Sequence, residues 1–345
     1  MWGNGGSSGV RTRDHQLKRL LLYRLSYRPK TIRTLRKKFA LVNTFDKLAR
    51  CRCTEGNYYP YSMTVLLLGK HGQLATMFRE HFDAEGISYV ALDRTACDVG
   101  NLNQVIEHVG AISPQVIINA TGYTKVDLME SEGKEEGWRV NAEAVQYIAE
   151  AAAKLDIPLV HFSTDYVFDG KKKRPYLETD TTNPLSEYGK SKKAGEDLAL
   201  SYAKSIVIRV SWLYGPGEQN FIRKFIAFNT GKTENNITGD EVSIPTHVSS
   251  LILATFALLE AKAYGLFHVC DKGPATGVSR AEFGRTIAKL RSMDIELKEV
   301  PMASWNLPAK RPAYSVLSTS KIQEILGREF PVWEQNVGEY IKTLD

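Results

Sequence analysis

The stretch TVLLLGKHGQLATMF, residues 64–78, decides the fold. Its first five residues form an almost unbroken apolar run, which is typical of a strand buried on both faces of a parallel sheet. Gly69 and Gly72 follow in a short turn, and Leu74 and Phe78 then recur at helical spacing. A strand, a glycine turn and a helix in this order predict the first unit of a doubly wound α/β fold.

The same alternation of apolar strands and helical patterns continues to Gly215. Further strands are expected at 87–93, 114–120, 157–168 (its opening part) and 205–215, and further helices at 101–112, 134–155 and 186–203. Continuous apolar strands separated by helices predict a parallel sheet covered on both faces. After Gly215 the pieces become shorter, which favours a smaller lobe whose elements could return to the sheet. We therefore expect an α/β protein with a nucleotide-binding domain at 63–215 and mainly a substrate-binding lobe at 216–345.

Composition excludes several classes of protein. With 345 residues, 43% of them hydrophobic and 24% charged, the chain is neither collagen-like nor a disulfide framework. Its four cysteines have no paired spacing, which favours a reducing compartment. The longest strong apolar run, LILATFALL at 251–259, is about half of the roughly 18–20 residues that a membrane span needs. We expect a cytoplasmic protein that does not bind a membrane.

The basic charge is concentrated in residues 1–62. They hold 14 Lys and Arg against three Asp and Glu, which is a net charge of +11. Because the whole chain has a net charge of +6, residues 63–345 have a net charge of −5. A mildly acidic body does not support a nucleic-acid groove. Four interpretations of this leader stay open: an organellar transit peptide, a nucleic-acid or membrane-surface arm, an expression leader or wrongly assigned gene start, and a helical extension packed on the body. Cys51 and Cys53 lack the partners of a metal site.

The glycine turn favours a nucleotide cofactor. Gly69 and Gly72 would let the backbone approach a pyrophosphate at a helix N-terminus. Asp93 ends the second predicted strand, where an acidic side chain can meet an adenosine ribose, whereas the neighbouring Arg94 could hold a 2′-phosphate. NADH and NADPH therefore both stay open. Asp98 could approach the adenine or cap the helix that follows it.

A second pattern indicates carbonyl chemistry. Tyr188 and Lys192 lie four residues apart on a predicted helix, hence on one face. An ammonium beside a phenol should lower the pKa of the phenol, which could then exchange a proton with a substrate oxygen. Ser163 and Thr164 follow a predicted strand, at the edge where ligands bind in such sheets. From the residues alone we expect carbonyl reduction with a nicotinamide.

The chain resembles the extended short-chain dehydrogenase/reductases and, among them, the dTDP-4-dehydrorhamnose reductase family. The motifs that carry the resemblance follow the family order: GKHGQL (69–74), NATGYTKVDLME (119–130), VNAEAV (140–145), STDYVFDG (163–170), Tyr188-x-x-x-Lys192, RVSWLYG (209–215) and KRPAYSVL (310–317). They run from residue 63 to the C-terminus. The segment GDEVSIPT (239–246) departs from the family's DQ-x-G-x-P-T, because Glu241 replaces Gln and Ser243 replaces Gly.

The resemblance implies a Rossmann sheet and a role for each matching residue. Cofactor contacts would come from Gly69, Gly72, Gln73, Leu74, Asp98, Val99, Ala120, Thr121, Thr124, Tyr188 and Lys192, beside Asp93 and Arg94. The catalytic residues would be Thr164, Tyr188 and Lys192. The sugar nucleotide would meet Val126, Asp165, Tyr166, Trp212 and Arg311. Asn119 and Asn141 are expected to be structural amides, and no metal is expected.

The implied activity is NADPH-dependent reduction of the C4 ketone of dTDP-4-dehydro-6-deoxy-L-mannose to dTDP-L-rhamnose, with NADH as a second cofactor candidate. Three alternatives stay open. The chain could reduce another sugar nucleotide, or it could be an epimerase or dehydratase that retains its nicotinamide. It could also be a non-catalytic NADP-binding regulatory subunit resembling the β subunit of methionine adenosyltransferase. A dTDP-sugar is the expected partner, no nucleic acid is expected, and a homodimer stays open.

Overall fold

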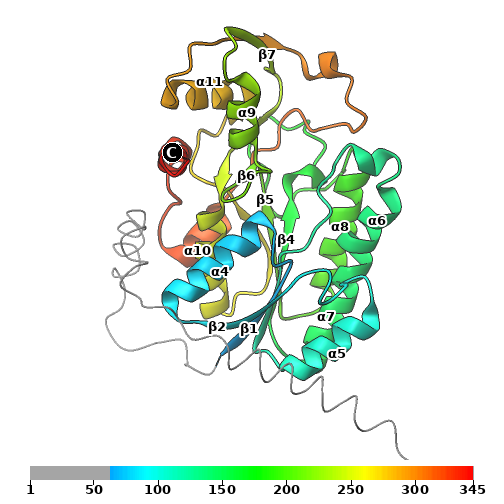
Figure 1. Cartoon of the computed structure of the whole chain (residues 1–345). Helices are drawn as coiled ribbons and strands as arrows, with labels where there is room; N and C mark the ends of the chain where they lie inside the picture. The colour runs from blue at the N-terminus through cyan, green and yellow to red at the C-terminus, as the bar shows by residue number, and fades with distance from the viewer. Residues whose placement is uncertain (1–62, 345) are drawn as a thin grey trace, which may run out of the picture. The chain divides into compact units, whose positions relative to one another are not determined.

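A six-stranded sheet forms the centre of the computed structural model, which describes residues 63–344 (Figure 1). The strand order is β10-β5-β4-β3-β1-β2, and every neighbouring pair is parallel. The strands are β1 (Thr64–Leu68), β2 (Ser88–Leu92), β3 (Val116–Asn119), β4 (Leu159–Thr164), β5 (Ser205–Val210) and β10 (Gly265–Val269). From β1 the chain proceeds to β2 on one side and to β3 on the other, so the carboxyl ends open a crevice there. The predicted doubly wound α/β fold is confirmed.

Helices cover both faces of the sheet (Figure 1). One face carries α4 (Gln73–Glu85) and α10 (Val248–Glu260), and the other carries α5 (Leu102–Ile112), α7 (Ala144–Leu155) and α8 (Glu187–Leu200). Successive residues of β1 serve opposite faces, as the strand period of two requires. Val65 belongs to the core cluster of Phe78 on α4, whereas Leu66 belongs to the cluster of Ile148 on α7.

The long helix expected at 134–155 is interrupted. It consists of α6 (Lys134–Trp138), a π-helical turn (Arg139–Glu143) and α7. Asn141 lies in the π turn, where its Oδ1 accepts from the Tyr123 N–H at 2.8 Å and its Nδ2 donates to Ser191 Oγ at 3.1 Å. Asn141 is thus the structural amide that the sequence predicted, and it ties the loop after β3 to α8. Such π turns occur mostly near functional sites.

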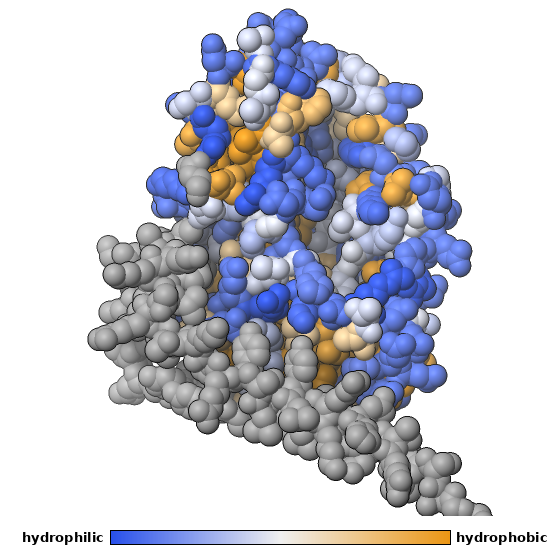
Figure 2. Space-filling view, viewed as in Figure 1, coloured by the Kyte–Doolittle hydropathy of each residue, from blue (hydrophilic) through white to orange (hydrophobic). Residues whose placement is uncertain are grey.

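The rest of the chain builds a smaller lobe above the sheet in the view of Figure 1. Its elements are β6 (Leu213–Tyr214), α9 (Phe221–Asn229), β7 (Glu234–Thr238), β8 (Val242–Ser243), β9 (Thr246–His247), β11 (Val278–Ser279), α11 (Arg280–Leu290), β12 (Glu296–Val300) and α13 (Trp333–Lys342). The helix α12 (Ser320–Leu326) instead packs against α10 and β10 at the central sheet. Phe225, Phe283 and Trp333 lie at the centre of its core. Figure 2 shows apolar side chains gathered on the upper part of the viewed surface. The exposed Phe228 of α9 belongs to the smaller lobe. Because β10 lies in the central sheet, a domain boundary at 215/216 stays a prediction.

Short 3₁₀ turns complete the described elements: η1 (Leu128–Glu130), η3 (Asp165–Val167) and η4 (Met302–Trp305). No helix in the described range is long and apolar enough to cross a membrane. The interpretations of residues 1–62, Cys51 and Cys53 included, lie outside the described residues.

Candidate functional site

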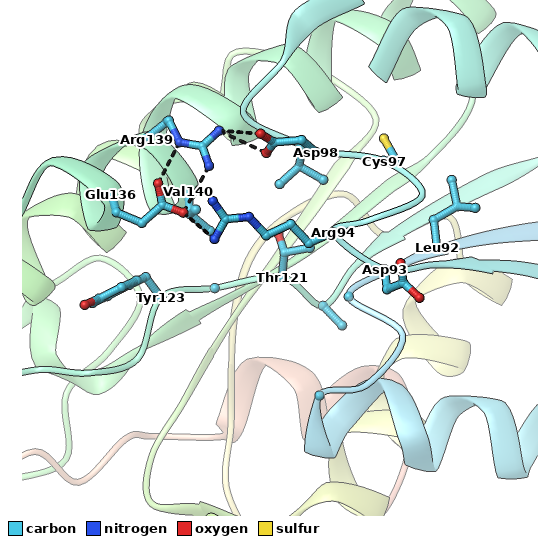
Figure 3. Close-up of a pocket in the computed structure, with 15 residues that line it drawn as sticks. Leu92, Asp93, Arg94, Cys97, Asp98, Thr121, Tyr123, Glu136, Arg139 and Val140 are labelled. Carbon is cyan, nitrogen blue, oxygen red and sulfur yellow. Dashed lines mark hydrogen bonds and ion pairs between the residues drawn. The ribbon is translucent and has the colours of Figure 1, made fainter. Parts of the chain in front are cut away.

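A cavity of about 270 Å³ opens at the carboxyl ends of β1, β2 and β3 (Figure 3). Its walls bring together eight residues predicted to bind a cofactor: Gly69, Gly72, Asp93, Arg94, Asp98, Val99, Ala120 and Thr121. The other five predicted cofactor residues do not line it: Tyr188 and Lys192 lie on α8, and the remaining three lie elsewhere. Gln73 is the first residue of α4, Leu74 is buried in the core and Thr124 is exposed.

Glycine is required at the first position of the turn. Gly69 has φ +94°, and a Cβ there would lie 2.9 Å from the backbone carbonyl of Ala120 at the end of β3. Gly72 is the N-cap of α4 and supplies no side-chain hydrogen bond to the helix. The turn therefore leaves both space and helix N–H groups for a pyrophosphate.

Gly69→Ala is expected to weaken NADPH binding by about 10- to 100-fold, because the strained backbone and the contact with Ala120 cost about 1–3 kcal/mol. A fluorescence titration of NADPH measures the change. Gly86→Ala is the matched control: Gly86 also has positive φ, but a Cβ there would meet nothing within 4 Å. The control should lower thermal stability and leave NADPH affinity unchanged. Equal affinity of Gly69→Ala and the unaltered protein would contradict this role of the turn.

Asp93 directly follows β2 and is an ionised carboxylate. Its Oδ1 accepts from the Thr95 hydroxyl at 2.8 Å and from the Ala96 N–H at 3.0 Å, and these hydrogen bonds lower the pKa of Asp93 to about 2. His71 Nε2 lies 3.1 Å from Asp93 Oδ2. The exposed Arg94 forms an ion pair with Glu136 at 2.9 Å. An anion and a cation thus stand together where the ribose of a dinucleotide is expected.

Asp98 is bound by an arginine that the sequence reasoning missed (Figure 3). Arg139 Nη1 donates to Asp98 Oδ1 at 2.9 Å, and Arg139 Nε donates to Glu136 at 2.7 Å. The alternative that Asp98 caps the next helix is wrong, because Asn101 caps α5 by accepting from two backbone N–H groups. Arg139 lies in the π turn. The sequence predicted an unbroken helix at 134–155, and that prediction gave no reason to place Arg139 at the cavity.

The three predicted catalytic residues lie at the ends of β4 and α8. Thr164 is the last residue of β4 and is 7% exposed, and its side chain hydrogen bonds to the phenol of Tyr188. Tyr188 and Lys192 lie one turn apart on α8. The structure thus brings the Thr164 hydroxyl to the Tyr188 phenol at the carboxyl edge of the sheet, with Lys192 one helical turn further along α8.

Lys192 does not act on Tyr188 as the sequence analysis expected. Burial raises the pKa of Tyr188 to about 12, and the hydrogen bond with Thr164 opposes this shift only in part. Lys192 Nζ instead donates to the Phe162 carbonyl oxygen at 2.6 Å. Burial lowers the pKa of Lys192 to about 8, although nearby Glu196 favours the charged form.

Asp165 lies inside the junction between the two lobes. It is 2% exposed, its Oδ2 accepts from Ser315 Oγ at 2.5 Å, and its Oδ1 accepts from Thr164 Oγ1 at 3.1 Å. Burial raises the pKa of Asp165 to about 7. Asp165, which the resemblance places at the sugar, therefore joins β4 to the KRPAYSVL segment (310–317).

The raised pKa of Asp165 predicts a stability that falls with pH. The unfolded carboxyl has a pKa near 3.9, so between about pH 4 and pH 7 the folded state binds the additional proton. This contribution is fully present below pH 4 and is lost as pH rises through 7. Asp165→Asn should therefore show a smaller drop in Tm between about pH 5 and pH 8 than the unaltered protein. The exposed Asp294→Asn is the control, and identical pH dependence in both variants would contradict the prediction.

Trp212 contacts a second arginine that the sequence reasoning missed. The guanidinium carbon of Arg280 lies 3.5 Å from the Trp212 ring centroid, and Phe283 stacks on Trp212 at 6.1 Å. Arg280 also forms an ion pair with Glu241 at 3.0 Å, and Glu241 accepts from the Tyr166 hydroxyl at 3.3 Å. Glu241, which replaces the family's Gln in GDEVSIPT, thus supplies the counter-ion for Arg280, the cation that covers Trp212.

Arg311 ties the C-terminal segment to the loop after β3. Its guanidinium donates to both Asp127 carboxylate oxygens, at 3.1 and 2.7 Å, and the Ala309 N–H donates to the same carboxylate at 3.2 Å. Val126, half-buried, precedes Asp127 in that loop. Among residues 63–344 no group of three or more His, Cys, Asp or Glu side chains is placed to hold a metal ion.

Comparison with known proteins places the chain in a family. The family model described as RmlD substrate binding domain matches residues 63–345. A dTDP-4-dehydrorhamnose reductase of Sinorhizobium fredii is 31% identical over 291 residues, which cover 82% of this chain and 98% of that protein. The crystal structure of a dTDP-4-dehydrorhamnose reductase from Clostridium acetobutylicum matches with TM-score 0.78 and 31% identity, over 82% of this chain and 99% of the other.

A second solved structure was determined with a cofactor. It is the dTDP-4-dehydrorhamnose reductase of Bacillus anthracis in complex with NADP, which matches with TM-score 0.77 and 29% identity, over 81% of this chain and 99% of the other. The match of the family model over the whole described body, together with relatives covered almost end to end, shows that the chain belongs to the RmlD substrate binding domain family.

Proposed function

We propose that this protein uses NADPH to reduce the C4 ketone of dTDP-4-dehydro-6-deoxy-L-mannose to dTDP-L-rhamnose. The observation that carries the proposal is the hydrogen-bonded pair of Thr164 and Tyr188, with Lys192 one turn away, at the sheet edge that also carries the cavity. The names of the relatives at 31–34% identity support this choice of substrate.

The cavity residues fit a dinucleotide. Gly69 and Gly72 leave room for its pyrophosphate, and Asp98 and Val99 would flank the adenine. Arg94 would meet a 2′-phosphate on release from Glu136, which favours NADPH and leaves NADH as a weaker cofactor. When bound there, NADPH supplies the hydride.

The reacting ketone would lie beside Thr164 and Tyr188. The Thr164 hydroxyl would hydrogen bond to the carbonyl oxygen and orient it. Tyr188, which keeps its proton at neutral pH because burial raises its pKa, would donate that proton as the oxygen becomes an alcohol. Tyr166, Trp212 and Arg311 would border the sugar nucleotide from the side of the smaller lobe. A cytoplasmic location and a homodimer stay predictions.

The test is the loss of absorbance at about 340 nm, the nicotinamide band, when the full chain meets NADPH and dTDP-4-dehydro-6-deoxy-L-mannose, with dTDP-L-rhamnose identified as the product. Turnover supports the proposal. NADPH binding without turnover would overturn it in favour of a regulatory subunit. Purified protein that carries a tightly bound NAD and regenerates it would favour an epimerase or dehydratase instead.

A further inference from the structure

A buried line of polar side chains runs from the cofactor cavity to Lys192. It begins at Thr121, which lines the cavity, and continues through Asn119 at the end of β3 and His161 in β4. Asn119 and His161 are direct neighbours in the β3–β4 register. Asn119 is 0%, His161 1% and Lys192 4% exposed, so solvent does not decide their hydrogen bonds.

The orientation of the Asn119 amide follows from its partner. The Thr121 backbone N–H, which can only donate, lies 3.1 Å from Asn119 Oδ1, and the Thr121 hydroxyl donates to the same oxygen at 2.6 Å. The amide oxygen therefore faces Thr121, and the Nδ2 group faces His161 Nδ1 at 3.2 Å. The amide nitrogen Nδ2 of Asn119 can only donate a hydrogen bond, so His161 Nδ1 must accept it.

The proton of His161 is thereby placed on its other nitrogen. Burial, and to a smaller extent the charge of Lys192, lowers the pKa of His161 well below its ordinary value, so the ring is neutral. A neutral imidazole with an accepting Nδ1 carries its proton on Nε2. His161 Nε2 lies 3.4 Å from Lys192 Nζ, so an N–H faces the amine.

This contact favours the neutral form of Lys192. An ammonium has no lone pair and would present hydrogens to the imidazole N–H, whereas a neutral amine can accept from it. The Phe162 carbonyl accepts from either form. The other titratable or charged groups around Lys192 are Tyr188 and Glu196 on α8 and Arg209 on β5, and Glu196 is already paired with Arg209 at 2.8 Å.

We propose that Asn119 and His161 are positioning residues that fix an imidazole N–H against Lys192, so that Lys192 exchanges its proton instead of remaining a permanent cation. The inference rests on the proposed function in one respect: Tyr188 must regain a proton in each turnover. A Lys192 amine that gains and loses its proton can take part in this return, whereas a permanent cation cannot.

Two spectroscopic readouts test the inference without substrate, so they stand even if the proposed reaction fails. In full-length protein with ¹⁵N-labelled histidine, His161 should show the Nε2–H tautomer, and His161→Gln assigns its signals. In protein with ¹³C-labelled lysine, the Lys192 signal, assigned by Lys192→Arg, gives the titration midpoint of its amine. A His161 ring that carries its proton on Nδ1 would overturn the proposal.

Asn119→Asp supplies the decisive variant. A carboxylate still accepts from Thr121, but it also accepts from His161 and draws a proton onto Nδ1. The Lys192 midpoint should then rise by about one pH unit or more, because Nε2 can accept from the ammonium or the carboxylate favours the charge. His161→Leu, which removes the N–H, should shift the midpoint in the same direction.

A merely structural role makes a different prediction. Asn220→Asp replaces another buried amide, in the smaller lobe, and should reduce stability without moving the Lys192 midpoint. In the active protein, the pH at which kcat declines on the alkaline side should follow the Lys192 midpoint in Asn119→Asp. If Asn119→Asp and His161→Leu lower kcat equally at every pH and leave the midpoint unchanged, both residues only hold the fold.

Discussion

Tyr188→Phe is expected to lower kcat by about 10²- to 10⁴-fold, the range that a positioned proton donor contributes. The variant keeps the ring that meets Tyr166 edge-on, with 6.0 Å between centroids, and removes only the hydroxyl that bonds to Thr164. NADPH affinity and Tm should therefore change little. Steady-state kinetics with the dTDP-sugar, together with an NADPH titration, separate the two effects.

Tyr147→Phe is the matched control for Tyr188. Tyr147 lies on α7, partly buried against the core that α5 and α7 form with the sheet, and its hydroxyl does not line the cavity. Its removal should leave kcat within about twofold of the unaltered protein, as expected of a substitution away from special contacts. Near-normal turnover of a folded Tyr188→Phe protein would show that another group supplies the proton.

The buried ion pair of Glu196 and Arg209 carries the largest expected effect on stability. The two side chains are 1% and 2% exposed, and the guanidinium meets both carboxylate oxygens at 2.8 Å. The pair fastens α8 to β5, and Ser163 Oγ, which donates to Glu196 at 2.5 Å, also fastens α8 to β4, the strand that ends at Thr164. Glu196→Ala leaves an arginine charge buried without its counter-ion and should destabilise the fold by about 3–5 kcal/mol.

The residue after Glu196 on α8 offers a matched comparison. Lys193 and Asp197 form an ion pair there in which Asp197 is 63% exposed, so Asp197→Ala should cost no more than about 1 kcal/mol. Replacing the buried pair together, as Glu196→Leu with Arg209→Met, should cost less than Glu196→Ala alone because no charge is stranded. Denaturant unfolding measures all three. Similar losses for Glu196→Ala and Asp197→Ala would show that burial does not decide the strength of the pair.

Periodicity predicted the sheet and its helices because each element shows its burial in its own sequence. The apolar run 64–68 and the stripe of α4 are local signals, and residues 205–210 form a strand where one was expected. The π turn at 139–143 was missed, because Asn141 within it contacts Tyr123 on another segment, and such a contact leaves no local signal in the sequence.

The sequence predicted some residues of the candidate site and missed others. Residues at strand ends and in the glycine turn were found, since topology alone brings them to one edge. Arg139, Arg280 and His161 were not singled out, because their importance depends on partners far along the chain: Asp98, Glu241 and Lys192. The pKa of Tyr188 was also expected in the wrong direction. The spacing shows that Lys192 and Tyr188 share a face of the helix. It does not show that burial raises the pKa of Tyr188 by more than a nearby amine lowers it.

The position of β10 at the edge of the sheet has a consequence for how the molecule folds. Its residues follow the first part of the smaller lobe in the chain, from β6 to β9, yet Gly265–Val269 pairs in parallel with β5. The sheet is therefore completed only after the chain has left it and returned, and such distant parallel pairing forms slowly. A nascent chain that ends near Gly215 would expose β5 as an unpaired edge, open to pairing with other chains. Once residue 269 has been translated, β10 can pair with β5 and take its place as the edge strand.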